Sequence, residues 1–536
     1  MKTRIRLILW LWLAGLMHAS TAPTAPRVLV RGVVCIAEPG ELTTTSRGPA
    51  PFDASRTPVL QEPAVATLVE PYIGVPLTPQ VSELVAATLR NWLQQHGHSF
   101  ITVYVPPQDV TDGILHIVVQ RAKLDGALQI EGANYFSEAS YRAAVPLAAG
   151  SEIDAAVVQA GVDRLNRGGY RRVVVAAEPG ATSGTTKLVL RTLETRPWTL
   201  SAGYNNTGTA LTDEDRVTAG VVWGNAFDRG DTLGYSFSAD PALEHSLSHS
   251  ANYGTIFKSG HSLTAFGSYS TIESALPAPL TQDGKSWQTG LRYTVPLAKT
   301  VGGWERGLNF AADFKYADNN LEFAAIPVTN NVTHIAQLGA TFSSSHRTPT
   351  QGLAWSASLY ASPGGLTSAN DNGAFERSRF GAKAAYVYGR IEGQYSRALP
   401  AGFSLSTTAS LQLASGPLLG TEQVNGAGSA GVRGYRESSA FSDEGVLVNT
   451  ELHLPAFSPF KGRGQADVFA FIDAAALWDL GSGATSAELA SSGIGVNYRL
   501  GRGFTLSAAY GWQWKEIPDL ADQGAGHGHI SASVRF

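Results

Sequence analysis

The chain is poor in cysteine, methionine and charge. It has 536 residues, of which one is cysteine (Cys35), two are methionine and 16% are charged, whereas average soluble domains carry about 25% charged residues. A single cysteine excludes an intrachain disulfide framework and any cysteine-based zinc or iron–sulfur site. The net charge of -4 provides no basic surface, which argues against nucleic acid as a partner.

Common catalytic signatures are also missing. The sequence contains no GxxxxGK[ST] phosphate loop, no HExxH zinc motif and no GxSxG nucleophile motif. Two histidine pairs, His96 with His98 and His527 with His529, could bind a metal, but such pairs are more often polar loop residues. We therefore expect no enzymatic activity, no catalytic residue, no metal site and no cofactor.

Long apolar runs are confined to the N-terminus. Lys2, Arg4 and Arg6 precede an apolar stretch at 7–16, and small residues follow it. This order is typical of a secretory signal peptide, here residues 1–22, which is removed from the mature protein. The alternative is an uncleaved membrane anchor, but the run is shorter than the ~20 residues that a spanning helix needs. No later run approaches that length, so we expect an exported protein that does not cross a membrane with helices.

A unit of one helix followed by two strands occurs twice between residues 27 and 194. In the first copy Thr78 supplies an N-cap, a proline follows it, and apolar residues then recur at helical spacing until Gly97 ends the helix. In the second copy the corresponding signals lie between Asp154 and Gly169. The four strands expected after these two helices lie at 100–105, 114–120, 172–177 and 187–192.

The residues before the first helix are less regular. We predict one strand at 28–36, which would hold Cys35 as a small buried residue. After it, prolines recur up to residue 70, and we expect a loose, insertion-like segment.

Beyond residue 195 apolar residues alternate with polar or small ones. A period of two in segments separated by Gly, Asn, Asp and Ser indicates antiparallel strands with one apolar face. Residues 195–536 have room for about 16 such strands at roughly 21 residues per strand and connection. The clearest segments are 291–297, 308–316, 355–359, 405–413, 446–454, 494–500, 506–514 and 530–536.

Two folds can use so many strands of this kind. A soluble sandwich buries its apolar faces, whereas a transmembrane barrel turns them to lipid and keeps a polar lumen. In this chain Tyr and Trp recur near strand ends, the opposite faces are small and polar, and the last residue, Phe536, ends an alternating strand. These features favour a transmembrane β-barrel of about 16 antiparallel strands in a bacterial outer membrane, where closure pairs every backbone group.

Two motifs in the barrel region carry a resemblance to a known family. Val432-Arg433-Gly434-Tyr435 lies in a Gly/Ser-rich stretch too long for a tight turn, and Phe471-Ile472-Asp473 lies in an apolar strand further on. They resemble the VRG[YF] and FxDxG motifs of outer-membrane assembly and secretion barrels, and the chain is similar to the TpsB transporters of two-partner secretion. The resemblance implies a long loop folded into the pore and locked there by Arg433, Gly434, Tyr435, Phe471 and Asp473.

The residues themselves agree with such a lock. An arginine inside a wide barrel needs a counter-charge, because the wall partly desolvates it. Asp473 shares a strand face with Phe469 and Phe471, so we expect a bridge between Arg433 and Asp473. The alternative is a solvated arginine and an aspartate that never meet. Ala475 stands where the family has glycine, which calls the close backbone approach at that point into question.

Other segments resemble TpsB proteins along nearly the whole mature chain, namely 106–115, 165–188 and 204–228. The resemblance implies two periplasmic α+β POTRA domains that bind extended polypeptide, followed by the barrel. The expected domains are 23–121 with an N-terminal segment and the first POTRA domain, 122–194 with the second, and 195–536 with the barrel.

The two ends of the chain also bear on this resemblance. TpsB proteins usually begin with a helix that plugs the barrel, but residues 27–36 already fit the first POTRA strand, so no plug helix is expected. At the other end, the resemblance implies that Phe536 is the C-terminal signal for barrel assembly.

The implied function is secretion across the outer membrane, with the POTRA domains in the periplasm. The expected partners are a large TpsA-like exoprotein with an N-terminal secretion domain, outer-membrane lipid and the barrel assembly machinery. One alternative is an insertase of the same superfamily, although insertases usually carry more POTRA domains. The other is a passive porin, which has no use for two peptide-binding repeats.

Overall fold

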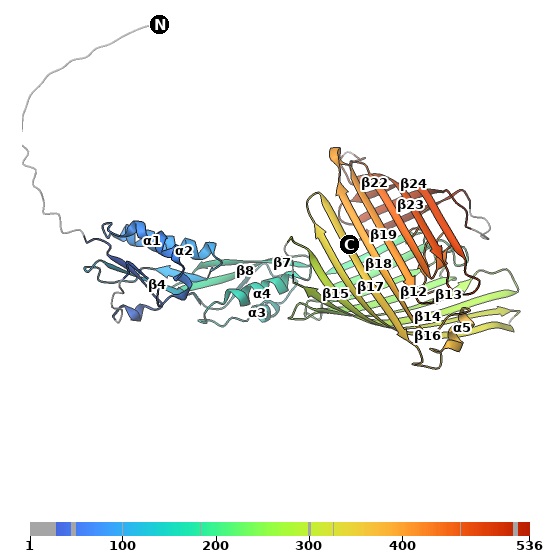
Figure 1. The fold of residues 1–536 in the computed structure, drawn as a ribbon, viewed down its shortest axis with the longest axis horizontal. Helices are drawn as coiled ribbons and strands as arrows, with labels where there is room; N and C mark the ends of the chain where they lie inside the picture. Colours follow the sequence, from blue (N-terminus) through green and yellow to red (C-terminus); the bar gives the residue numbers. More distant parts are fainter. Residues whose placement is uncertain are drawn as a thin grey trace, which may run out of the picture. The chain divides into compact units, whose positions relative to one another are not determined.

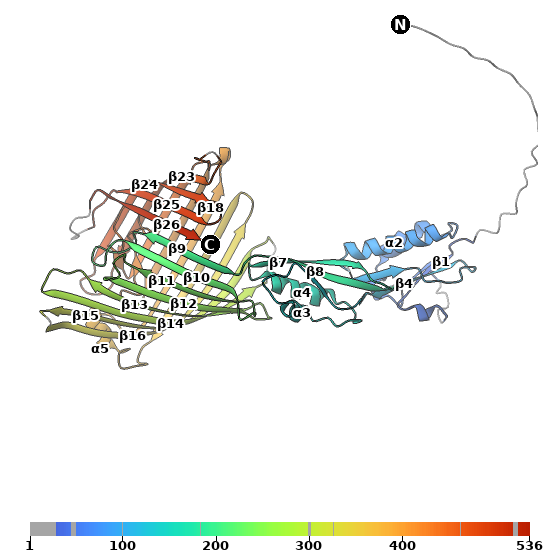
Figure 2. The ribbon, with the colours of Figure 1, turned by 180° about the vertical axis from the view of Figure 1, so that it is seen from behind.

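The computed structural model describes residues 28–43, 50–98, 100–182, 184–298, 302–324, 326–460, 462–517 and 524–536. The expected signal peptide, residues 1–22, lies outside them. The chain divides into two compact units (Figures 1 and 2). The first contains the residues up to Gly132 with 141–163 and 173–192, and the second contains 133–140, 164–172 and 193–536. None of the helices in the described ranges is long and apolar enough to cross a membrane.

The first unit begins with a four-stranded sheet in the order β2-β1-β4-β3. Strand β1 (Gly32–Ile36) is parallel to β2 (Phe52–Asp53) and β4 (Ile114–Arg121), and β3 (Ile101–Tyr104) is antiparallel to β4. Buried side chains of the sheet and of helices α1 (Pro63–Val69) and α2 (Pro79–Gln95) form one core. Helix α2 begins where the sequence predicts, because Thr78 Oγ1 accepts a hydrogen bond from Val81 N at 3.2 Å.

The segment expected to be loose is structured in its described residues, so that prediction was wrong for them. It contains β2, α1 and the 3₁₀ turns η2 (Pro58–Leu60) and η3 (Glu70–Tyr72), after η1 (Pro39–Thr43). Pro58, Pro63 and Pro71 lie in the first turns of η2, α1 and η3, where the missing N–H removes no helical hydrogen bond. Leu60, Val65 and Val69 are completely buried in the core. The strand predicted at 28–36 also begins later, at Gly32.

Truncating Leu60 tests this correction. Leu60→Ala is expected to destabilise the first unit by about 2–5 kcal/mol, because a fully buried side chain is lost and a cavity remains. Leu68→Ala is the matched control, since the Leu68 side chain on α1 is 39% exposed. Hydrogen exchange of the β4 amides in the purified protein measures the difference. Equal protection of β4 in both variants would show that Leu60 does not stabilise the core.

Cys35 lies in β1 and is buried, as predicted. Burial raises the pKa of its thiol from 9.0 to about 12, and the charge of Asp53 contributes. The reactive thiolate is therefore nearly absent at pH 8. Because the folded pKa is raised, the neutral thiol contributes stability below about pH 9 that falls as the pH rises towards 12.

We expect Cys35 to resist maleimide at pH 8 in the folded protein and to react completely after unfolding. Mass spectrometry before and after denaturation counts the bound label. Rapid labelling of the folded protein would contradict the buried position of Cys35.

A second four-stranded sheet is built around β8 (Thr185–Glu194). The short strands β5 (Lys123–Leu124) and β6 (Gln129–Glu131) pair with β8 in parallel, and β7 (Arg171–Pro179) pairs with it as well. The helix and the two strands expected in the second repeat correspond to α4 (Ala155–Asn166), β7 and β8. Helix α3 (Glu138–Ala144), β5 and β6 are additional elements, too short to show a periodic pattern in the sequence.

The second unit is a closed barrel of sixteen strands, each antiparallel to its neighbours, which confirms the predicted fold. Strands β20 and β21 form a separate two-stranded sheet and are not part of the barrel wall. The wall strands in chain order are β9 (Trp198–Asn205), β10 (Arg216–Ala226), β11 (Asp231–Ala239), β12 (Ser246–Ile256), β13 (Ser262–Ser274), β14 (Leu280–Leu297), β15 (Glu305–Phe323), β16 (Ile326–Arg347), β17 (Gln351–Pro363), β18 (Ala385–Ala398), β19 (Ser404–Ala414), β22 (Glu444–His453), β23 (Gln465–Trp478), β24 (Ser486–Leu500), β25 (Phe504–Gln513) and β26 (Gly526–Arg535).

The alternation seen in the sequence separates two faces of the wall. On β15, Phe310 is 47% exposed on the outside, whereas Asp313 is buried on the lumen side. The pairing of neighbouring strands places lumen-facing residues opposite one another. These residues are often small and polar, as with Ser343 on β16 opposite Ser356 on β17. An apolar outer face and a polar lumen are what a lipid-embedded barrel requires.

The ring closes between its first and last strands. Ser531–Arg535 of β26 pairs with Ser201–Asn205 of β9. At the end of this seam Phe536 N donates to Leu200 O at 2.9 Å, and Leu200 N donates to Phe536 O at 3.3 Å. Phe536 therefore takes part in closing the barrel.

Connections lie at both ends of the barrel. The chain enters β9 at Trp198, so the connections that follow β9, β17, β19 and β23 lie at the opposite end, called the far end below. The β17–β18 connection, residues 364–384, contains α5 (Asn372–Ser378), and η4 (Pro400–Gly402) precedes β19.

Candidate functional site inside the barrel

The β19–β22 connection, residues 415–443, is called the pore loop. It contains the short antiparallel pair β20 (Val424–Asn425) and β21 (Phe441–Ser442). Ala427, Val432 and Tyr435 in its inner part are buried in a cluster with lumen-facing side chains of β22, β23 and β24. The loop is therefore folded into the lumen rather than extended into solvent.

The structure brings Arg433 and Asp473 together. Arg433 donates from Nε to Asp473 Oδ2 at 2.7 Å and from Nη2 to Oδ1 at 2.9 Å, and its backbone N donates to Oδ2 at 3.1 Å. Its Nη1 donates to Glu451 on β22. Asp473 is 0% exposed, and two-pronged pairing of this kind is among the strongest hydrogen-bonded contacts in proteins.

Aromatic side chains complete the surroundings of Arg433. The guanidinium carbon lies 3.8 Å from the ring centroid of Phe471 and 5.7 Å from that of Phe469, which are cation–π distances. The wall leaves room for both rings at glycines of β24. A Cβ on Gly493 would come within 2.3 Å of Phe471, and a Cβ on Gly495 within 2.2 Å of Phe469.

Gly434 brings the backbone of the pore loop against the wall. Its φ is +92°, and a Cβ there would meet the backbone carbonyl of Gly511 on β25 at 2.8 Å. Its N–H donates to His529 Nε2 at 3.2 Å, and its carbonyl accepts from Gln513 Nε2 at 2.7 Å. The close backbone approach therefore occurs at Gly511, whereas Ala475 packs its methyl group in the buried cluster.

Tyr435 is completely buried, and its hydroxyl is fully used. The hydroxyl donates to Lys515 O at 2.6 Å and accepts from Ala490 N at 3.2 Å. Ala490 lies on β24, and Lys515 follows β25. The five residues singled out by the sequence motifs thus lie in one site between the loop and strands β22–β26.

Three polar residues of this site were missed or misjudged. Glu451 lies on the lumen face of β22, and the alternation of the segment 446–454 carries a signal for it. His529 was expected in a polar loop, which was wrong, because it is buried in β26 and accepts the Gly434 N–H. Glu422 of the pore loop pairs with Lys315 of β15, and no motif or spacing in the sequence predicts this contact. In the described part of the chain no group of three His, Cys, Asp or Glu residues could hold a metal ion.

Space remains in the lumen beside the pore loop. A cavity of about 840 Å³ extends between the loop and strands β14–β22. Small and polar residues predominate in its lining, including Ser343, Ser345, Ser356, Thr408, Ser410 and Ala430. A wall of this kind offers hydrogen bonds but few apolar contacts to a passing chain.

Comparison with known families assigns most of the chain. Residues 184–498 match the family of haemolysin secretion/activation proteins ShlB/FhaC/HecB, and residues 52–121 match the ShlB-type POTRA domain. The second POTRA domain expected at 122–194 stays a proposal, which rests on the sheet around β8.

Individual relatives are distant in sequence and similar in fold. The outer membrane transporter CdiB of Dickeya dadantii (strain 3937) is 23% identical over 79% of this chain and 75% of the relative. The haemolysin transporter protein ShlB of Serratia marcescens is 25% identical over 54% of this chain and 52% of the relative. The structure of CdiB from Escherichia coli superposes with a TM-score of 0.67 at 16% identity, covering 98% of this chain and 93% of that one.

A further solved structure has a similar fold. BamA from Haemophilus ducreyi lacking POTRA domains 1–3 superposes with a TM-score of 0.53 at 16% identity over 86% of this chain and 95% of that chain. At such identities the structural likeness establishes the fold alone. The family match covers more than half of the chain and confirms the predicted membership among TpsB transporters. The chain belongs to the ShlB/FhaC/HecB family of haemolysin secretion/activation proteins.

Proposed function

We propose that this protein recognises one large unfolded exoprotein through its POTRA domains and passes it through the barrel to the cell surface. The barrel lies in the outer membrane and the POTRA domain in the periplasm, as in other members of the family. The far end of the barrel is then the cell-surface end. Secretion is the work of this family, and we propose no enzymatic step.

The observation that carries the proposal is the lock between the pore loop and the wall. Arg433 on the loop contacts Asp473 and Glu451 on the wall through hydrogen bonds and opposite charge. Such contacts can be exchanged for others one at a time, so the loop can leave its place without unfolding the barrel. A passive diffusion pore needs no such lock.

An edge strand of the first sheet supports recognition of an extended chain. β3 ends the strand order β2-β1-β4-β3, and an extended peptide can add to a strand in this position. Arg90 Nη2 donates to the Val103 carbonyl on β3 at 2.8 Å. An incoming peptide would replace this side-chain contact with main-chain hydrogen bonds, which demand little of the peptide sequence.

A comparative secretome tests the function. The gene is deleted and restored as wild type, as Arg433→Ala or as Arg436→Ala, and proteins in the medium and periplasm are quantified. Arg436 is the matched control, because it lies on the same loop but is half-exposed and pairs with Glu214. We expect one large protein to leave the medium on deletion, to return with wild type and Arg436→Ala, and to return poorly with Arg433→Ala.

Two other results would contradict the proposal. An unchanged medium with many outer-membrane barrels depleted would indicate an insertase. No change in either fraction would indicate a passive porin.

A further inference from the structure

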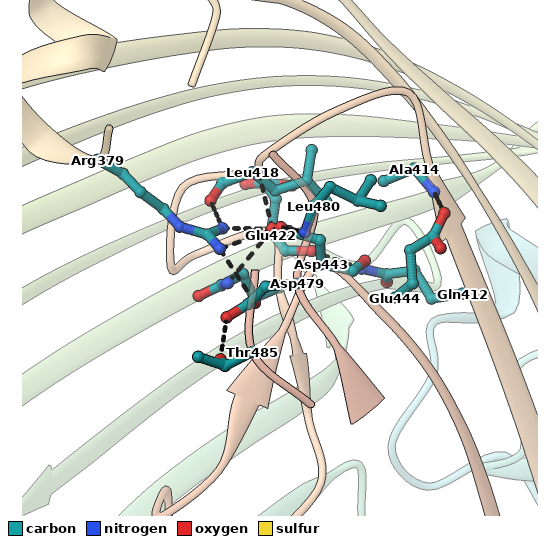
Figure 3. A network of polar contacts seen from close by, with 11 residues as sticks. Arg379, Gln412, Ala414, Leu418, Glu422, Asp443, Glu444, Asp479, Leu480 and Thr485 are labelled. Atoms are coloured by element: carbon teal, nitrogen blue, oxygen red, sulfur yellow. Dashed lines mark hydrogen bonds and ion pairs between the residues drawn. The ribbon is translucent and has the colours of Figure 1, made fainter. Parts of the chain in front are cut away.

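A second buried ion pair lies at the far end of the barrel, where the pore loop joins β22. Arg379 follows α5 in the β17–β18 connection, and Asp443 is the last residue of the pore loop. Both guanidinium Nη atoms donate to the Asp443 carboxylate, with Nη2 to Oδ2 at 3.0 Å (Figure 3). Nη2 also donates at 3.0 Å to Oδ1 of Asp479 in the β23–β24 connection.

Asp443 depends on Arg379 for its counter-charge. The carboxylate is 0% exposed, and its other donors are the neutral groups Leu418 N at 2.8 Å, Leu480 N at 2.9 Å and Gln423 Nε2 at 3.3 Å. In the described part of the chain, Arg379 is the one cation paired with it. Loss of Arg379 therefore leaves a buried, uncompensated anion, which is strongly unfavourable.

The same arginine holds the beginning of the pore loop. Arg379 Nη1 donates to the carbonyl oxygen of Leu418, so a single side chain ties residues near both ends of the loop. Leu418 and Leu419 are buried together with Phe375 of α5 and with the lumen-facing Ile335 and Tyr386. The two connections thus pack as one layer on the lumen side of β16 and β18.

The pair at Arg379 shares no residue with the lock at Arg433. Arg433 binds Asp473 and Glu451 within β22 and β23, whereas Arg379 binds the connections at the far end of the barrel. Asp443 and Asp473 each have their own arginine. The two pairs can therefore open one after the other.

We propose that Arg379 is an outer latch that closes the cell-surface mouth of the pore. It holds the β17–β18 connection, both ends of the pore loop and the β23–β24 connection in one closed layer. The inference rests on the proposed function, in which the polypeptide leaves through this mouth. Opening the mouth requires Asp443 to part from Arg379 while Arg433 remains bound to Asp473.

Two buried reporters test the latch in the full-length protein in outer membranes. Leu418→Cys lies beside the latch, Val432→Cys lies beside Arg433, and both positions are buried in the closed state. Each is combined with Arg379→Ala and labelled with a membrane-impermeant maleimide. Arg377→Ala is the matched control, since Arg377 lies in the last turn of α5, two residues before Arg379, with its side chain exposed.

We expect Arg379→Ala to accelerate labelling of Leu418→Cys by about tenfold or more, because charged hydrogen bonds are lost. Val432→Cys should remain protected, and Arg377→Ala should change neither rate. Asp443→Asn, which keeps the shape of the side chain, should give the same pattern more weakly. The shift in gel mobility on heating confirms that each variant has folded as a barrel.

Protection of Leu418→Cys in the folded Arg379→Ala variant would overturn the latch. Equal exposure of Val432→Cys would also overturn it, because the two pairs would then open as one unit. Labelling requires no secreted partner. The latch can therefore fail while secretion is confirmed, and secretion can fail while the labelling pattern holds.

Discussion

Replacing Asp473 by alanine is expected to release the pore loop from the wall. The change leaves Arg433 half-paired in a buried site and removes three hydrogen bonds to the loop. Breaking a buried pair from one side costs about 3–5 kcal/mol, which lowers the ratio of docked to released loop more than about a hundredfold.

Protection of Val432→Cys from maleimide measures this release. Val432 is completely buried in the docked loop and becomes accessible when the loop leaves. The native Cys35 is expected to stay silent in the same experiment. Asp467→Ala is the control, because Asp467 lies on the lumen face of the same strand and contacts His453 instead of the loop. An equal labelling rate in both variants would show that Asp473 does not hold the loop.

Replacing Gly434 by alanine is expected to displace the pore loop by a different route. The backbone at this position has a φ of +92°, which costs a residue with a Cβ about 1–3 kcal/mol. The added Cβ would also lie 2.8 Å from the Gly511 backbone, where neither strand β25 nor the loop can yield cheaply. Both costs fall on the docked state alone.

Conductance of the purified protein in planar bilayers reports the outcome. A displaced loop leaves a wider lumen, so Gly434→Ala should conduct more than wild type. Gly416→Ala on the same loop is the control, because a Cβ there meets nothing within 4 Å. Wild-type conductance in the Gly434→Ala variant would mean that the loop tolerates the side chain and that the backbone contact is not needed.

Sequence periodicity predicted the barrel well because each wall strand faces two different environments. Phe310 and Asp313 differ in polarity since one faces lipid and the other faces the lumen. The same alternation of apolar and polar residues recurs along the wall strands. The same reasoning failed for residues 50–72. There, short helices begin at prolines, and a short apolar segment such as that around Leu60 shows no period to recognise.

Of the two arginine pairs, only the one at Arg433 could be predicted from the sequence. Arg433 and Asp473 belong to motifs whose resemblance to a family suggested their partnership. Arg379 and Asp443 lie in connections without a motif, and only the closed ring brings the β17–β18 and β23–β24 connections together. The position of His529 was predicted wrongly because Gly526 and Gly528 precede it, and glycines at this spacing are typical of a loop. Only the pairing with β25 shows that these residues belong to a strand.

The seam between β26 and β9 determines when this protein can become a ring. Its partners are separated by more than three hundred residues, so no part of the seam can form early from local contacts. Phe536 and Leu200 exchange hydrogen bonds at the end of the seam, and these bonds require β26 to have reached β9. Until then β9 is an open edge able to pair with other chains. Closure of this barrel is therefore a late event in folding, in which the pairing of β26 with β9 removes the exposed edge.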